Sequence, residues 1–142
     1  MRIFPFYNAT GNFIIRLMVG LVFLSEGIQK FLFPGLDGVG RFTKLGIPHP
    51  DLLGPFVGIT EITCGLLLII GLYIRLAAVP LLIVILNAIY FTKVPELLSK
   101  GFWATAHDGR TDFCMFAGLI FLLFYGSGLY SADSRFQRNA RK

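Results

Sequence analysis

Charged side chains are scarce in this sequence. They make up 15% of its 142 residues, whereas soluble domains usually carry about 25%. Hydrophobic residues make up 55%, and the mean hydropathy is +0.70. A soluble chain of this length cannot bury that much apolar surface, because a small protein has a high ratio of surface to volume. The composition therefore excludes a soluble globular protein and predicts one domain in lipid.

The residue types that hold metals, haem and nucleotides are also scarce. The sequence has two histidines and two cysteines, and they do not stand at the spacings of zinc, iron–sulfur or bis-histidine haem sites. It has no Cys-x-x-Cys pair and no glycine loop of the Walker or Rossmann type. We therefore expect no bound metal or haem, so redox chemistry would require a diffusing quinone or a cofactor in a partner. Cys64 and Cys114 are expected about 18 Å and 4 Å below the outer ends of their spans, which excludes a disulfide between them.

Long apolar stretches account for most of the chain. A helix needs about 20 apolar residues to cross the hydrocarbon core of a membrane. The stretch from Phe113 to Ala132 contains no charged residue, whereas the first stretch carries Arg16, Glu26 and Lys30. The sequence predicts an all-α, antiparallel four-helix bundle in a membrane, with spans at about 12–33, 52–72, 75–93 and 111–131.

Basic residues predict the orientation. Lys and Arg outside the spans favour the cytoplasmic side, and four spans place both termini on one side. The tail after the last span carries Arg135, Arg138, Arg141 and Lys142. We therefore predict cytoplasmic termini and a tail that faces anionic lipid rather than nucleic acid. Arg16 is expected to snorkel at the inner surface, and the aromatic segment 4–7 is expected to lie among the headgroups.

Glycine and proline mark the connections between the spans. The sequence predicts an outer loop at 34–51 with a short helix at 39–45, a tight inner turn at 71–75, a second outer loop at 95–110 and a frayed tail from 131. Phe102 and Trp103, in the second outer loop, are expected at the membrane interface.

One face of the second span is unusual because glycines surround a carboxylate there. Three glycines fall within about 60° of Glu61 on a helical projection: Gly54, Gly58 and Gly65. Small residues on one face allow two membrane helices to approach closely, so this face is expected to pack against another helix.

Several ionisable residues fall within the spans. Such a residue at the bilayer centre costs roughly 2.5–3.5 kcal/mol, so it normally faces protein and has a partner. Glu61 and Glu26 are expected about 14 Å and 10 Å below the outer ends of their spans. Lys30 follows Glu26 by four residues and lies on the same helical face. The other two spans contribute further polar residues to the outer half: Asn87, Lys93, His107, Arg110 and Asp112.

Two interpretations of these residues remain open. In the first, Glu26 with Lys30, and Glu61 with an Arg or Lys, form buried ion pairs that fix the register of the helices. In the second, they line a ligand site that opens to the outer face. Proton exchange in that site, its catalytic role, is then assigned to Glu26, Glu61 and His107. Substrate binding is assigned to Lys30, Asn87, Lys93, Arg110, Asp112 and Trp103.

Three motifs resemble the DoxX family of small integral membrane proteins: GLVFLSEGIQKF (20–31), GxxExxxGLLLxxGLYIRLAA (58–78) and GFWATAHDGRTDF (101–113). The resemblance covers nearly the whole chain. The resemblance implies a four-helix subunit of the inner (cytoplasmic) membrane and redox work that involves quinone or sulfur compounds such as thiosulfate. The positions that match the family motifs are Glu26, Lys30, Glu61, Arg75, His107, Arg110 and Asp112.

The leading hypothesis is a membrane subunit of a quinone-linked oxidoreductase, with an exchangeable quinone as its cofactor. Its partners would be membrane lipid, a soluble or membrane-bound redox enzyme, or further copies of the chain, but not nucleic acid. One alternative is a non-catalytic anchor or assembly partner for a soluble redox enzyme. Another is a carrier of a small molecule or lipid. The sequence leaves open whether the chain is catalytic by itself.

Overall fold

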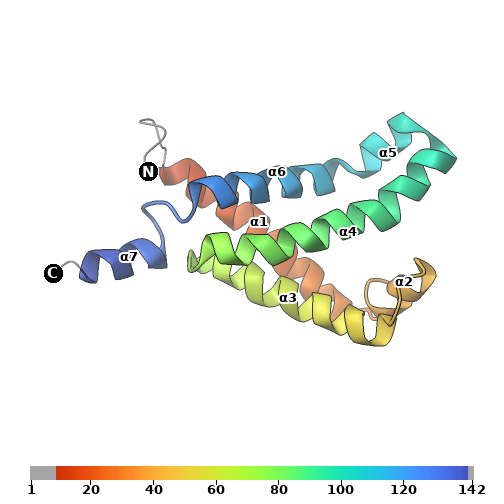
Figure 1. The fold of residues 1–142 in the computed structure, drawn as a ribbon, viewed down its shortest axis with the longest axis horizontal. Helices are drawn as coiled ribbons and strands as arrows, with labels where there is room; N and C mark the ends of the chain where they lie inside the picture. The colour runs from red at the N-terminus through yellow and green to blue at the C-terminus, as the bar shows by residue number, and fades with distance from the viewer. Residues whose placement is uncertain (1–8, 141–142) are drawn as a thin grey trace.

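The structure is a computed structural model that describes residues 9–140 (Figure 1). The predicted aromatic anchor at 4–7 and the last two basic residues of the tail lie outside this range. Over the described residues the chain is helical and contains no strand. Its helices are α1 (Ala9–Leu32), α2 (Val39–Lys44), α3 (Pro50–Ile70), α4 (Ile74–Lys100), α5 (Phe102–Asp108), α6 (Arg110–Tyr125) and α7 (Ala132–Asn139).

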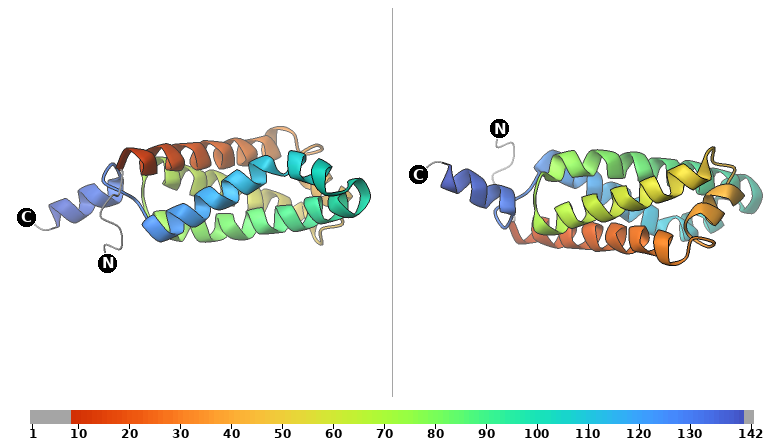
Figure 2. Two further views of the ribbon diagram at one scale, coloured as in Figure 1. Left: turned by 90° about the horizontal axis from the view of Figure 1, so that it is seen from above. Right: turned by 90° about the horizontal axis from the view of Figure 1, so that it is seen from below.

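Four longer helices run antiparallel and side by side. Helix α1 packs against α3 and α6, and α4 packs against the same two helices. We call one end of this assembly the loop end, because α2 lies there against α3 and α5 joins α4 to α6 (Figure 1). We call the other the tail end, since α1 begins there and α7 projects from it (Figure 2).

Three of these helices, α1, α3 and α4, are long and apolar enough to cross a membrane. Helix α6 is also apolar, but its 16 residues are fewer than the roughly 20 that a straight crossing needs. The prediction of an all-helical, multi-pass membrane chain is therefore confirmed over the described residues, which include three helices that could cross a membrane.

The predictions for the second outer loop and for the tail were wrong, because most of their residues are helical. Helix α4 continues through Pro95 to Lys100, and α5 follows after one residue, so most of the expected loop at 95–110 is helix. The extra turns of α4 are stabilised by an ion pair of 3.3 Å between Glu96 and Lys100, four residues apart. The tail is not frayed over 132–139, where the Ser131 hydroxyl caps α7 by accepting a hydrogen bond from the Ser134 amide at 3.1 Å.

Arg16 does not snorkel, since only 2% of the residue is exposed. Its guanidinium donates to the carbonyls of Leu68 and Ile69 in the last turn of α3, at 3.1 and 3.2 Å. It also donates to the carbonyls of Ser127 and Tyr130, at 2.8 and 2.7 Å. A cation at a helix C-terminus satisfies carbonyls that have no partner within the helix. Arg16 thereby ties α1 to α3 and to the segment between α6 and α7.

The predicted glycine face of α3 is confirmed as a packing surface. Its residues Gly54, Gly58, Glu61 and Gly65 are all buried. Gly58 and Gly65 meet two glycines of α1, Gly27 and Gly20, whose packing role the sequence analysis did not identify. A β-carbon on Gly27 would lie 2.8 Å from the carbonyl oxygen of Gly58, and one on Gly20 would lie 2.9 Å from that of Gly65. The backbones of α1 and α3 therefore touch, as small residues permit in membrane helices.

The apolar core lies toward the tail end. Its α4 residues come from the first half of that helix, the last of them being Ile85. The α6 residues are Met115, Leu119 and Leu122, and they pack with Val19 of α1 and Leu68 of α3. Beyond this core, α4 and α5 diverge from α2 and α3 toward the loop end (Figure 1). The polar residues predicted to form a site lie in this diverging half.

Candidate functional site

The first polar group joins α1 to α3 and consists of Glu26, Lys30 and Glu61. The Lys30 ammonium nitrogen lies 2.7 Å from Oε2 of Glu61 and 3.9 Å from Oε2 of Glu26. The Lys30 and Glu61 side chains are 10% and 5% exposed, whereas that of Glu26 is 47% exposed. The group, which we call the Lys30 group, is thus a buried cation between one enclosed and one accessible carboxylate.

The local sequence explains this geometry. Glu26 and Lys30 share a face of α1 because they stand four residues apart. Glu61 lies within the glycine face of α3, and the contact of Gly27 with Gly58 brings the two backbones together beside it. A charge at this depth is tolerated only with a partner, and the close approach of the helices lets the Lys30 side chain supply it.

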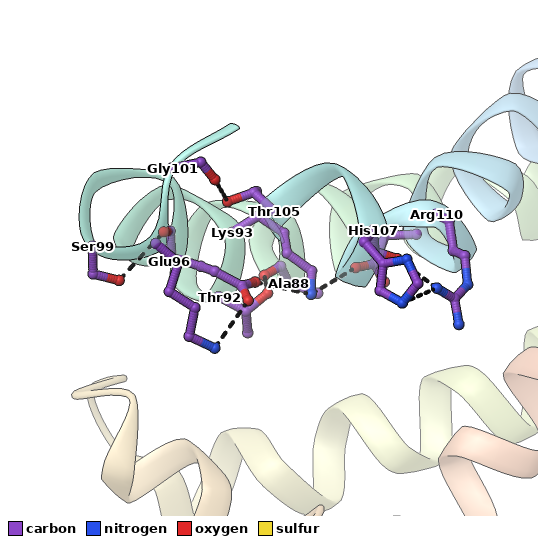
Figure 3. Close-up of polar contacts among 11 residues, drawn as sticks. Ala88, Thr92, Lys93, Glu96, Ser99, Gly101, Thr105, His107 and Arg110 are labelled. Atoms are coloured by element: carbon purple, nitrogen blue, oxygen red, sulfur yellow. Dashed lines mark hydrogen bonds and ion pairs between the residues drawn. The ribbon is translucent and has the colours of Figure 1, made fainter. Parts of the chain in front are cut away.

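A second polar group joins α4 to α6 and consists of Lys93, Glu96 and Asp112. The Lys93 ammonium nitrogen lies 3.5 Å from Oε2 of Glu96 and 3.8 Å from Oδ2 of Asp112. Figure 3 shows Lys93 and Glu96 on α4 beside α5. Asp108 of α5 lies at its edge, where a side-chain hydrogen bond with Glu96 and the positive charge of Lys100 lower its pKa. We call this the Lys93 group.

The remaining predicted site residues lie outside both groups. The Arg110 guanidinium lies 2.8 Å from Nε2 of His107 and donates to the His107 carbonyl at 3.0 Å (Figure 3). Both side chains are exposed. Asn87 is exposed and donates to the Ile83 carbonyl of its own helix at 2.8 Å. Trp103 is 83% exposed and contacts Phe102 edge to face.

The nine predicted site residues therefore divide between two groups and the surface. The described residues show no ion pair or hydrogen bond that links the Lys30 group to the Lys93 group. Among residues 9–140, no three His, Cys, Asp or Glu side chains gather in an arrangement that could hold a metal ion. The residues to which the sequence analysis assigned one site thus lie in separate parts of the protein. The Lys30 group is more deeply buried than the Lys93 group.

The sequence analysis missed Glu96, which forms ion pairs with Lys93 and Lys100 near the end of α4. It was assigned to a loop because Pro95 precedes it. Its spacing of three residues from Lys93 and four from Lys100 was the available signal, since such pairs stabilise a helix. The carbonyl contacts of Arg16 had no signal, because they depend on how α3 and the end of α6 lie beside α1.

The fold and composition define this chain as a multi-pass helical integral membrane protein. It belongs to the DoxX family, whose profile matches residues 11–94. This match includes the whole Lys30 group and ends before His107 and Arg110.

Two relatives extend the comparison. The chain is 50% identical over 132 residues to a protein of Mycobacterium tuberculosis described as uncharacterized membrane protein Rv3486, covering 89% of this chain and 81% of the relative. It is 30% identical over 124 residues to an uncharacterized protein of Haemophilus influenzae, covering 86% of this chain and 87% of the relative. No solved structure matches the chain.

Proposed function

We propose that this chain is a membrane subunit of a quinone-linked oxidoreductase and that the Lys30 group is its quinone site. The observation that carries the proposal is the buried Lys30 ammonium, 2.7 Å from Glu61 and 3.9 Å from Glu26. Ionisable residues within membrane helices are characteristic of proton and substrate pathways, and here three of them converge.

The residues of the Lys30 group could bind a quinone oxygen and transfer a proton between that oxygen and the surroundings. A lysine ammonium has three N–H donors, so one remains for a carbonyl oxygen when two carboxylates take the others. Quinone supplies that oxygen and, when bound, accepts two electrons and two protons, one on each of its oxygens. Glu61 is enclosed and would exchange the proton at the oxygen bound to Lys30, while water would supply the proton at the other oxygen. Glu26 is half exposed and would pass that proton to or from the surroundings.

The electrons would come from a reduced sulfur compound such as thiosulfate, or from a redox partner. The test is quinone reduction in proteoliposomes with thiosulfate as donor. Glu61→Gln and Lys30→Met should each lower turnover at least about tenfold, as loss of a proton-transferring group does. The matched controls Asp51→Asn and Lys44→Met change exposed residues at the same end and should retain turnover.

Three results would contradict this function, and two of them would favour another one. Equal turnover in wild type, Glu61→Gln and Lys30→Met would remove the quinone site. No turnover by the isolated chain, with a stoichiometric redox enzyme that co-purifies, would favour the anchor or assembly role. Net flux of a small molecule across the liposome without redox change would favour a carrier.

We also propose four crossings in the inner membrane, with the tail end in the cytoplasm. Helix α6 is short, but the segment 126–131 continues it toward the tail end, and side chains of α1 satisfy its backbone carbonyls. Asn12 donates to the Gly126 carbonyl at 2.9 Å, and Arg16 donates to those of Ser127 and Tyr130. Non-helical backbone is tolerated at membrane depth when protein covers it in this way. In a Cys114→Ser background, which removes the exposed native thiol, labelling of Gln137→Cys from the cytoplasmic side alone would support this orientation. Labelling of Gln137→Cys from outside would contradict it.

A further inference from the structure

A cleft of about 870 Å³ opens at the tail end, away from both polar groups. Its lining residues come from the start of α1, the end of α3 and the segment 129–139 that includes α7. Figure 2 shows α7 projecting from the other helices at this end. Its lining includes the apolar side chains of Phe13, Ile70 and Leu129. It also includes Arg135 and Arg138 of α7.

The charge of the cleft is positive. Arg16 lies at its base, held in place by its hydrogen bonds to backbone carbonyls. None of the described residues that line the cleft is acidic. Asp133, the acidic residue of α7, turns elsewhere and accepts a hydrogen bond from the Tyr73 amide at 3.2 Å. The three arginines therefore face the cleft without a carboxylate in its lining.

We propose that this cleft binds an anionic phospholipid, with its phosphate between Arg135 and Arg138 and an acyl chain along Phe13 and Ile70. Arginine binds phosphate oxygens in a bidentate manner, and basic residues beside membrane helices attract anionic headgroups. Phe13 and Ile70 are 39% and 56% exposed on helices that are long enough to cross the membrane. These exposed apolar side chains favour a lipid over free phosphate, because free phosphate has no acyl chain that could pack against them. The proposal does not depend on the quinone function.

The test is native mass spectrometry of the full chain from detergent with equimolar phosphatidylglycerol and phosphatidylethanolamine of identical acyl chains. The wild type should retain phosphatidylglycerol preferentially. Arg135→Gln/Arg138→Gln should lower that preference about tenfold or more, because each arginine contributes to headgroup attraction. Arg41→Gln/Lys44→Gln removes two exposed basic residues at the loop end and should leave the preference unchanged. Both double variants should melt like wild type by circular dichroism.

Each contrary outcome overturns the proposal. Equal retention of the two lipids by wild type would show that the cleft does not recognise a headgroup. An unchanged preference in Arg135→Gln/Arg138→Gln, or an equal loss in the loop-end control, would show that these arginines do not form the site. Displacement of phosphatidylglycerol by millimolar inorganic phosphate (roughly 1–10 mM) would assign the cleft to a free anion instead.

Discussion

Lys30 and Glu61 connect α1 to α3 through an ion pair of 2.7 Å in which neither side chain is more than 10% exposed. The contact stands beside glycines whose backbones touch across the same interface. A buried pair of this kind is sensitive to the loss of one partner, because the other charge is then left without compensation. The pair therefore belongs to the proposed quinone site and also stabilises the contact between α1 and α3. The two roles can be separated by experiment.

Loss of one member should destabilise the protein more than loss of both. We expect Lys30→Met to lower the free energy of unfolding by about 3–5 kcal/mol, since it leaves Glu61 buried without a cation. Glu61→Gln should lower it less, because Lys30 keeps Glu26 at 3.9 Å. Lys30→Met/Glu61→Met should recover most of this stability while lacking quinone turnover. Unfolding in mixed micelles, followed by circular dichroism, measures the stability. A double variant as unstable as the sum of the single variants would show that the pair is not coupled.

The glycine contact between α1 and α3 should not accept a larger side chain. A β-carbon on Gly27 would meet the Gly58 carbonyl oxygen at 2.8 Å and the Ile62 amide nitrogen at 2.9 Å, both backbone atoms. Gly27→Ala should therefore destabilise the protein by about 1–3 kcal/mol. The control is Gly35→Ala, where a β-carbon would have no atom within 4 Å. Equal stabilities of the two variants, measured by the same unfolding assay, would contradict the predicted close contact.

Arg16 should not be replaceable by lysine. Its guanidinium reaches carbonyls of Leu68, Ile69 and Ser127 at once, and a single ammonium cannot match that geometry. We expect Arg16→Lys to lower the free energy of unfolding by at least about 3 kcal/mol, because hydrogen bonds from a charged donor are each worth roughly 1.5–3 kcal/mol. Arg41→Lys is the control, since Arg41 is 47% exposed and forms one ion pair of 3.6 Å. If the melting temperature of Arg16→Lys equals that of the wild type, Arg16 does not stabilise the contact of α1 with α3 and with the segment after α6.

The Lys93 group should stabilise the α4–α6 contact at the loop end. Lys93→Met removes both ion pairs, to Glu96 and Asp112, and should lower stability by about 1 kcal/mol, as expected for partly exposed pairs. Lys100→Met, at a side chain 62% exposed, should have a smaller effect. Hydrogen exchange should quicken near 90–112 in Lys93→Met alone. Similar exchange in both variants would show that Lys93 does not join the helices.

Part of the site could be predicted from local spacing. The four-residue interval predicted that Glu26 and Lys30 share a face, and the glycines around Glu61 predicted that it packs against a helix. Both predictions are confirmed. The pairing of Lys30 with Glu61 could not be predicted, because it depends on which helix packs against α3. Glu96 was missed for a local reason: Pro95 was interpreted as the start of a loop, whereas its helix continues to Lys100.

The sequence by itself determined that this protein lies in a membrane. A chain with so few charges and such long apolar stretches can remove its apolar surface from water only in lipid. It also determined which residues within the helices need partners. Only the tertiary structure decided which groups those partners are. Lys30 forms an ion pair with Glu61, and Arg16 donates hydrogen bonds to backbone carbonyls. The physical reason is that helical periodicity specifies one face of one helix, while contacts between helices depend on how their backbones approach.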